Sequence, residues 1–246
     1  MEFSKKDIIL KSWNVLMGHM GLWILIMLFI FSLNIITSIV QEKLLEDITA
    51  QAILFIVAAY LFQSGLNLGM LKVALNIHNK IEVDFGQIFG SFHLLMTFVM
   101  ATIIFLFLII LSASLGIVLL FMSVSDNFIS PLGLKNSNNV PFIMSLLIII
   151  IPATYASIRM QYYNYFLVDK ECGAIVAIKN SIKITQGSVG KLFVLGAALS
   201  IIILISMLPL MLGLLISIPL ATMVNTRIYL MLKENLLDDI SRLQIQ

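Results

Sequence analysis

The chain has 246 residues, of which 60% are hydrophobic and 11% are charged, and its mean hydropathy is +1.06. Soluble proteins carry roughly 25% charged residues, so this composition excludes a soluble domain and indicates an integral membrane protein. The formal net charge of +2 is too small to favour nucleic acid as a partner. The single cysteine, Cys172, excludes an internal disulfide and a thiolate metal cluster.

The N-terminal segment combines lysines with a short apolar stripe. Ile9, Trp13 and Leu16 share one helical face, which predicts an interfacial helix with Trp13 at the depth of the lipid headgroups. The apolar run 21–40 then reaches about 20 residues, the length of one membrane crossing. No A-x-A-like cleavage site follows it, so we expect a retained first span rather than a signal peptide.

A second span is predicted from about 52 to 77. It carries Gly65 and Gly69 at a GxxxG spacing, with Asn67 between them. Small residues four apart allow two helices to approach closely. The spacing predicts packing within the helix bundle, and dimerisation of the chain is the alternative.

A further amphipathic element is predicted after the second span. Apolar residues recur there at i, i+4, i+7 and i+11, in Ile81, Phe85, Ile88 and Phe92. The apolar stretch 94–124 that follows is about 31 residues long, which exceeds one upright crossing. The third span must therefore tilt, bend or protrude.

The fourth span is predicted over about 141–168, and Pro152 within it is expected to kink the helix or to free a backbone site for another donor. Polar and aromatic residues gather at its inner end, where Arg159, Gln161 and Asn164 stand among tyrosines. Such a mixture is typical of the interface between membrane and water.

A basic amphipathic helix is predicted next. Ile175, Ile178 and Ile182 share one helical face, whereas Lys179 and Lys183 line another. This pattern predicts an interfacial helix whose lysines face anionic headgroups. The alternatives are a helix in a soluble loop and a connector that packs on other parts of the protein.

The last apolar stretch, 192–232, is about 41 residues long, which suits two spans joined by a tight turn near Pro209 and makes six spans in total. In this arrangement only Lys43 and Lys135 fall on the outer side, and the other 13 of the 15 Lys and Arg residues fall on the inner side. The positive-inside rule therefore predicts that both termini are cytoplasmic.

An internal repeat is compatible with this order of elements. Apolar residues and a glycine recur at matching intervals before three of the spans, which divides the single membrane domain 1–246 into units 1–77, 78–170 and 171–246. Each unit would contain one interfacial helix and a pair of spans. The matching residues are common ones at short intervals, so coincidence is the alternative.

Two stretches carry a resemblance to a known group of proteins. The sequence AIKNSIKITQG within Ala174–Leu195 and the sequence of Gly69–Phe89 are similar to characteristic segments of uncharacterised bacterial six-span membrane proteins. That group is similar to the membrane domain of some glycerophosphodiester phosphodiesterases. The resemblance implies a six-span all-α fold in the bacterial cytoplasmic membrane, and it implies no activity.

Motifs for chemistry are missing from the sequence. There is no GxSxG, no HExxH and no glycine-rich phosphate loop, and His19, His78 and His93 are isolated from one another. No Asp or Glu lies within the core of a predicted span, which argues against a proton-coupled pump. We therefore expect neither an enzyme nor a cofactor or metal site.

The candidate site is a set of polar residues toward the inner halves of the even-numbered spans. Its members are Asn67, Arg159, Gln161, Asn164, Asn225 and Arg227. Polar groups in lipid are costly unless they are paired, so the pattern favours a pocket open to the cytoplasm in which Arg159 and Arg227 bind an anionic group such as a lipid phosphate. Alternatively, both arginines reach out to headgroups and the amides bond between helices.

Two classes of function fit these features. The first is a non-enzymatic accessory or scaffold protein that engages membrane lipids, anionic lipids included, or partner membrane proteins. The second is a transporter or the permease subunit of an ABC exporter, which would move a small or amphipathic solute with a separate ATPase. Lys179 and Lys183 suit either class, because they could bind headgroups or dock on an ATPase.

Overall fold

The structure, a computed structural model, describes residues 5–44, 49–128, 140–208 and 212–244. All regular elements within these ranges are helical. The α-helices are α1 (Lys5–Gly18), α2 (Met20–Leu44), α3 (Ala50–His78), α4 (Leu95–Phe128), α5 (Val140–Met160), α6 (Tyr163–Lys170), α7 (Ala174–Ile184), α8 (Val189–Ser206) and α9 (Leu214–Gln244). Two short 3-10 helices, η1 (Phe85–Phe89) and η2 (Phe92–Leu94), precede α4.

Six helical segments are long and apolar enough to cross a membrane, which confirms the predicted number of spans. They are Met20–Lys43, Ala50–His78, Phe85–Met122, Phe142–Lys170, Val189–Ser206 and Leu214–Leu237. The turn predicted near Pro209 lies outside the described residues, between the end of α8 and the start of α9. The protein is therefore an all-helical, multi-pass membrane protein.

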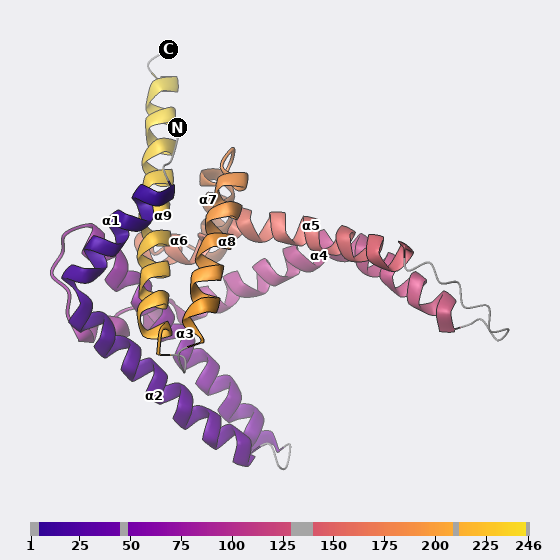
Figure 1. The fold of residues 1–246 in the computed structure, drawn as a ribbon, viewed down its shortest axis with the longest axis horizontal. Helices are drawn as coiled ribbons and strands as arrows, with labels where there is room; N and C mark the ends of the chain where they lie inside the picture. The colour runs from indigo at the N-terminus through magenta and orange to yellow at the C-terminus, as the bar shows by residue number, and fades with distance from the viewer. Residues whose placement is uncertain (1–4, 45–48, 129–139, 209–211, 245–246) are drawn as a thin grey trace.

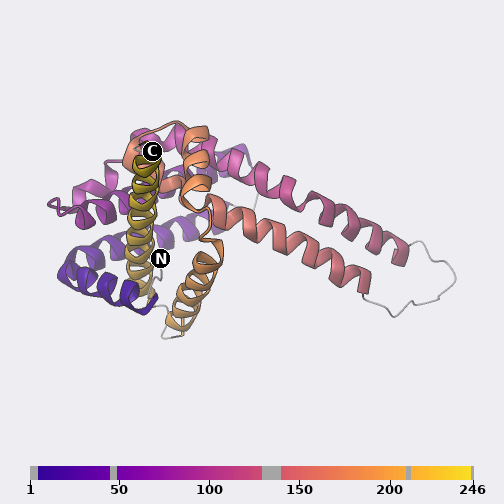
Figure 2. The ribbon, with the colours of Figure 1, turned by 90° about the horizontal axis from the view of Figure 1, so that it is seen from above.

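Three helix hairpins leave a common hub (Figure 1). The pairs α2/α3, α4/α5 and α8/α9 each pack side by side. The α4/α5 hairpin, here called the α4/α5 arm, projects away from the other elements in two perpendicular views (Figures 1 and 2). The hub contains α1, η1, η2, α6 and α7 together with the adjoining ends of the long helices. The length of α4, 34 residues, is thus accommodated by protrusion.

The buried core lies in the hub. Its largest fully buried side chains include Leu16 of α1, Trp23 of α2, Tyr229 of α9, and Tyr162, which lies between α5 and α6. Along the α4/α5 arm, by contrast, large apolar side chains are exposed, and Phe107 is 62% exposed. A soluble protein would not tolerate such a surface, whereas the hydrocarbon of a bilayer solvates it.

The segment before α4 differs from its prediction. Two short 3-10 turns form in place of one amphipathic α-helix, and Asp84 begins the first turn by accepting a hydrogen bond from the backbone N–H of Gln87 (3.2 Å). The ring of Phe85 packs edge-on against Phe29 of α2, with 5.4 Å between centroids. The apolar residues of this segment therefore contact the hub in a tighter helical geometry.

The helix α7 forms as predicted, but its buried face is rotated from the predicted stripe. Ala177, Ile178, Ser181 and Ile184 are buried, whereas Ile175 is 58% exposed. This face packs against α4, α5, α6 and α9. A connector that packs on other parts of the protein, one of the alternatives from the sequence, describes these contacts.

Two glycines of α3 allow the 3-10 segment to approach closely. A Cβ atom at Gly69 would lie 1.8 Å from the backbone carbonyl oxygen of Ile88, and one at Gly65 would lie 2.8 Å from the ring of Phe92. Backbone cannot yield as a flexible side chain can, so Gly69 is required by this contact. The GxxxG spacing is used for packing within the chain.

Replacing Gly69 by Ala should destabilise the protein by about 1–3 kcal/mol, because the added methyl group forces α3 and η1 apart. The measurement is the free energy of unfolding in mixed micelles. Gly196→Ala on α8 is the matched control, since a Cβ there meets nothing within 4 Å. The control should be neutral or slightly stabilising because alanine favours helix. Equal effects of the two substitutions would contradict the close contact.

Candidate functional site

The six polar residues predicted as a site lie around the hub without forming one bonded cluster. Asn67 is exposed on α3, and the half-buried members are Arg159, Gln161, Asn164, Asn225 and Arg227. In the described ranges, no ion pair or hydrogen bond joins the side chain of one member to that of another. Arg227 on α9 lies within electrostatic range of His78 on α3. The anion pocket of Arg159 and Arg227 therefore stays a prediction.

The fourth span is interrupted where Arg159 stands. The helix α5 continues through Pro152 and ends at Met160, and α6 begins at Tyr163 after a two-residue turn. Such a break frees backbone groups that need partners in an apolar environment. We call this interruption the α5/α6 break.

Side chains of α7 supply these partners. The Ser181 hydroxyl accepts a hydrogen bond from the backbone N–H of Tyr162 (3.0 Å) and donates one to the backbone carbonyl of Arg159 (3.1 Å). The hydroxyl of Thr185, the C-cap residue of α7, lies 3.0 Å from the same carbonyl oxygen and 2.8 Å from the carbonyl oxygen of Ser181, so its single proton is shared between them. Both side chains are fully buried. Ser181 of α7 therefore holds the end of α5 and the start of α6, and the C-cap residue Thr185, one turn later, adds a contact to the end of α5.

Aromatic side chains surround α6 below this break. The rings of Tyr165 and Tyr229 are stacked with 5.2 Å between centroids, and Phe166 meets Tyr229 edge-on at 5.1 Å. Tyr162 packs against both tyrosines. Aromatic pairs in these geometries each contribute about 0.5–1.5 kcal/mol beyond the burial of their area. They fasten α6 to α9 at the centre of the hub.

A charged group completes the contact between α6 and α9. Oδ2 of Asp169 accepts hydrogen bonds from the Tyr229 hydroxyl (2.7 Å) and from Nζ of Lys233 (2.6 Å). The side chains of Lys233 and Asp169 are only 21% and 15% exposed. Hydrogen bonds to charged groups contribute about 1.5–3 kcal/mol, so this pair is a firm link rather than a surface ion pair.

Sequence reasoning missed this pair. Asp169 follows the predicted end of the fourth span and Lys233 follows that of the sixth, so both lie beyond the inner ends of the predicted spans. Their opposite charges at two span ends were a usable signal, but only the tertiary packing of α6 on α9 brings them together. The partner of a charge at the end of a span can be predicted only when the adjacent helix is known.

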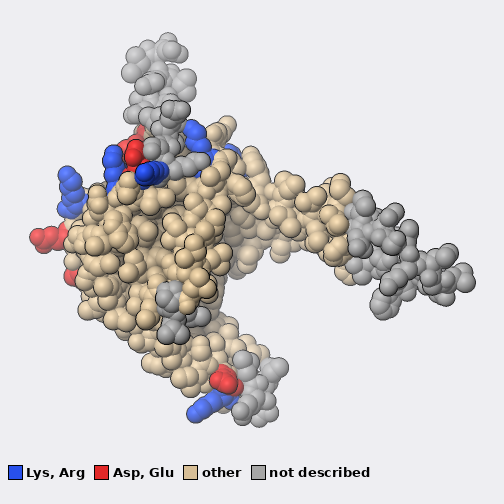
Figure 3. Space-filling model, in the orientation of Figure 1, with Lys and Arg blue, Asp and Glu red and all other residues tan. Residues whose placement is uncertain are grey.

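Charged side chains are unevenly distributed over the molecule. Lys and Arg gather over the hub end, near α1, α7 and α9, and a small charged group lies at the far end of the α2/α3 hairpin (Figure 3). Lys179 and Lys183, predicted to face headgroups, are exposed on α7, and Trp13 is 36% exposed on α1. Phe85, the other predicted interfacial residue, is partly buried against the hub.

The three histidines each contact a different part of the chain. His19 and His78 bond to the backbone carbonyls of Val15 and Ala74, and His93 pairs with Glu171 at 3.4 Å. Among the described residues, no three His, Cys, Asp or Glu side chains are grouped to hold a metal ion.

Comparison with known proteins adds no identity. No protein family, curated protein or solved structure matches the chain. The resemblance to six-span bacterial proteins stays a prediction.

Removing the Ser181 hydroxyl should destabilise the packing of α7 against the α5/α6 break. In Ser181→Ala the Tyr162 amide loses its acceptor, which should cost about 1–3 kcal/mol of unfolding free energy in mixed micelles. Ser145→Ala is the control, because Ser145 is equally buried and bonds only within α5, to the Phe142 carbonyl. A loss in the control as large as that in Ser181→Ala would show that the break does not depend on α7.

The thiol of Cys172 reports on the charge of Asp169. Partial burial, and then the nearby carboxylate, raise the pKa of Cys172 above its ordinary value. Because the thiolate is the reactive form, alkylation in micelles should accelerate only above the pH that is usual for cysteine. Asp169→Asn should move this midpoint to lower pH, without abolishing the effect of burial. Glu171→Gln is the control and should leave the midpoint unchanged; equal shifts would contradict the role of Asp169.

Proposed function

We propose that the protein is a non-enzymatic scaffold or accessory factor that engages lipids or partner membrane proteins. In this proposal it resides in the bacterial cytoplasmic membrane, with both termini in the cytoplasm. The exposed apolar surface of the α4/α5 arm is the observation that supports it most. This surface needs an apolar environment, and the hub does not cover it.

The exposed side chains of the α4/α5 arm indicate which kind of molecule the arm could contact. Phe107, Ile110 and Leu115 are 62%, 60% and 65% exposed. Within the arm, the backbones of α4 and α5 approach closely at Gly116, where a Cβ would meet Ile149 at 2.6 Å. The arm is thus closely packed internally, and its outer apolar faces suit acyl chains or the helices of another membrane protein.

The distribution of charge supports the proposed orientation. Basic side chains gather over the hub end (Figure 3), and the positive-inside rule assigns such an end to the cytoplasm. The short elements α1, η1/η2 and α7 all lie in the hub, each before one hairpin (Figure 1). This order supports the proposal of three repeat units, 1–77, 78–170 and 171–246, each with an element at the cytoplasmic interface.

Photo-crosslinking along the arm tests the proposal. A benzophenone amino acid at Phe107 in native membranes should react with lipid or with a partner membrane protein, because this side chain is 62% exposed. The matched control is the same label at Phe105, two residues away, whose ring lies 5.4 Å from that of Tyr163. The control should yield products within the chain.

Products within the chain from both positions would contradict a free arm. They would indicate that the six spans close into a bundle, as the alternative transporter requires. Co-purification of an ATPase together with ATP-dependent movement of a solute in vesicles would then establish that alternative.

A further inference from the structure

Three amide side chains lie on one exposed surface of the α2/α3 hairpin. Gln63 and Asn67 are exposed one helical turn apart on α3, and Nε2 of Gln63 donates a hydrogen bond to Oδ1 of Asn34, which is exposed on α2. Gly65 and Gly69, which pack on the 3-10 segment, lie on the opposite side of α3. We call the surface formed by Asn34, Gln63 and Asn67 the α2/α3 amide face.

The amide face lies near the middle of a span. Ser64 is the central residue of the 29-residue span Ala50–His78, and Gln63 and Asn67 lie within about 5 Å of it along the helix. The hydrocarbon core of a bilayer is about 30 Å thick, so it extends about 15 Å to either side of its middle. Both amides are therefore surrounded by acyl chains wherever protein does not cover them.

The amide face offers more hydrogen-bonding groups than the chain itself uses. Within the described ranges, the side-chain oxygen of Gln63 and the whole amide group of Asn67 have no hydrogen-bond partner. A primary amide has two donor hydrogens and one acceptor oxygen, and an acyl chain can pair with none of them. Because unpaired polar groups in hydrocarbon are costly, the face requires a polar partner from outside the chain.

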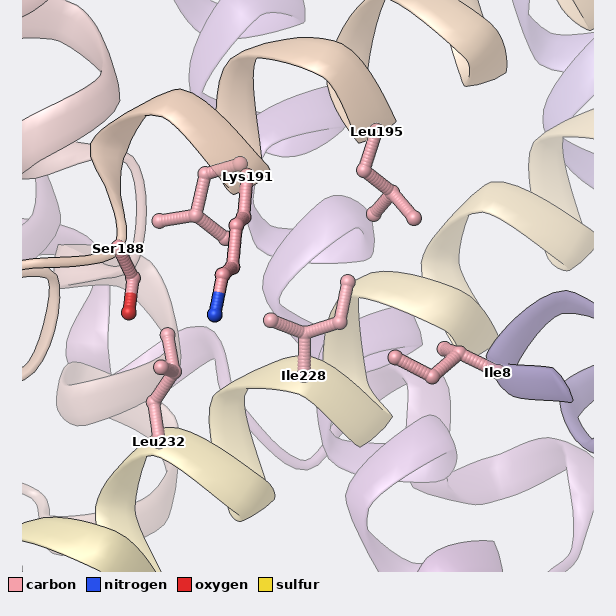
Figure 4. Close-up of a pocket in the computed structure, with 7 residues that line it drawn as sticks. Ile8, Ser188, Lys191, Leu195, Ile228 and Leu232 are labelled. Atoms are coloured by element: carbon pink, nitrogen blue, oxygen red, sulfur yellow. The ribbon is translucent and has the colours of Figure 1, made fainter. Parts of the chain in front are cut away.

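Apolar contacts between the helices of this protein impose no such requirement. Where α1, α8 and α9 meet, Ile8, Leu195 and Ile228 line one small space of about 30 Å³ (Figure 4). Such side chains pack equally well against one another and against acyl chains. The amide face differs from these contacts, because lipid cannot satisfy it.

Symmetry makes a second copy of this chain the partner that meets the requirement. Copies of a membrane protein insert in the same orientation, so the two-fold axis of a dimer is parallel to the membrane normal. Equivalent residues then lie at equal depth, which brings Gln63 and Asn67 to the depth of their own equivalents. An amide is both donor and acceptor, so it pairs with an identical amide. A different protein would need polar groups at the same two depths by coincidence.

We propose that the protein forms a two-fold symmetric dimer through the α2/α3 amide face, in which the side chains of Gln63 and Asn67 bond to those of the second copy. This dimer goes beyond the proposed function, because it uses the α2/α3 hairpin and not the α4/α5 arm (Figure 1). It does not depend on what the arm contacts, so photo-crosslinking at Phe107 and the dimer experiments can fail separately.

Energy transfer between copies of the 246-residue chain tests the dimer. Copies with a donor or an acceptor fluorophore at the C-terminus are mixed in lipid vesicles and diluted with added lipid. Asn67→Leu should weaken dimerisation by at least about fivefold, because the interface loses its amides while no hydrogen bond within the described chain is broken. Ala58→Leu is the matched control, since Ala58 is exposed on the opposite side of α3, and it should change dimerisation less than twofold.

A disulfide between copies tests the symmetry. Cys172→Ser removes the single cysteine of the chain, and Asn67→Cys in that background places one thiol on the amide face of each copy. Oxidation in native membranes should yield a covalent dimer, because a disulfide forms where the two Cα atoms come within about 7 Å. Ala58→Cys in the same background is the control and should remain monomeric.

Several results would overturn the dimer or its interface. Wild-type protein without energy transfer at every dilution would show a monomer. Equal effects of Asn67→Leu and Ala58→Leu, or a disulfide at Ala58→Cys and none at Asn67→Cys, would place the interface on another surface. Co-purification of a different membrane protein that is lost in Asn67→Leu would assign the amide face to that protein in place of a second copy.

Discussion

The α5/α6 break depends on one constraint, that backbone polar groups buried in an apolar environment must be hydrogen-bonded. A continuous fourth helix would satisfy this constraint within itself. The chain instead stops α5 at Met160, and Ser181 of α7 and the α7 C-cap residue Thr185 bond to the groups that the break exposes. The amphipathic helix is therefore a structural part of the fourth span as well as a connector.

The arrangement of the hub follows from that break. Because α6 is released from the direction of α5, it lies among α3, α7 and α9, where Tyr165 stacks on Tyr229 and Asp169 binds Lys233. The α4/α5 arm can then leave the hub in its own direction (Figure 2). One local interruption thus both fastens the centre and separates an arm from it.

The proposed function uses the part of this architecture that leaves the hub. The α4/α5 arm exposes apolar surface, which suits contact with acyl chains or with other transmembrane helices. This use follows from hairpins that diverge from a hub, because divergent helices expose faces that a closed bundle would bury (Figure 1).

Much of the architecture is determined by the sequence alone. Apolar runs of spanning length specify six membrane segments, since only helices satisfy their own backbone in lipid. The basic residues of α7, Lys179 and Lys183, are exposed as their helical spacing predicts. Local periodicity is sufficient for such features, because they depend on residues close together in the chain.

Only the tertiary structure decided how the spans and the polar residues are used. The α5/α6 break, the rotated buried face of α7 and the pair of Asp169 with Lys233 all require partners that are distant in sequence. Hydrophobicity cannot predict these partners, because faces toward lipid and faces toward other helices are equally apolar. The polar residues Asn67, Arg159 and Arg227 share an inner position by sequence, yet packing separates their contacts. In a membrane protein, composition therefore determines which segments lie in the membrane, whereas close packing and hydrogen bonding determine which residues contact one another.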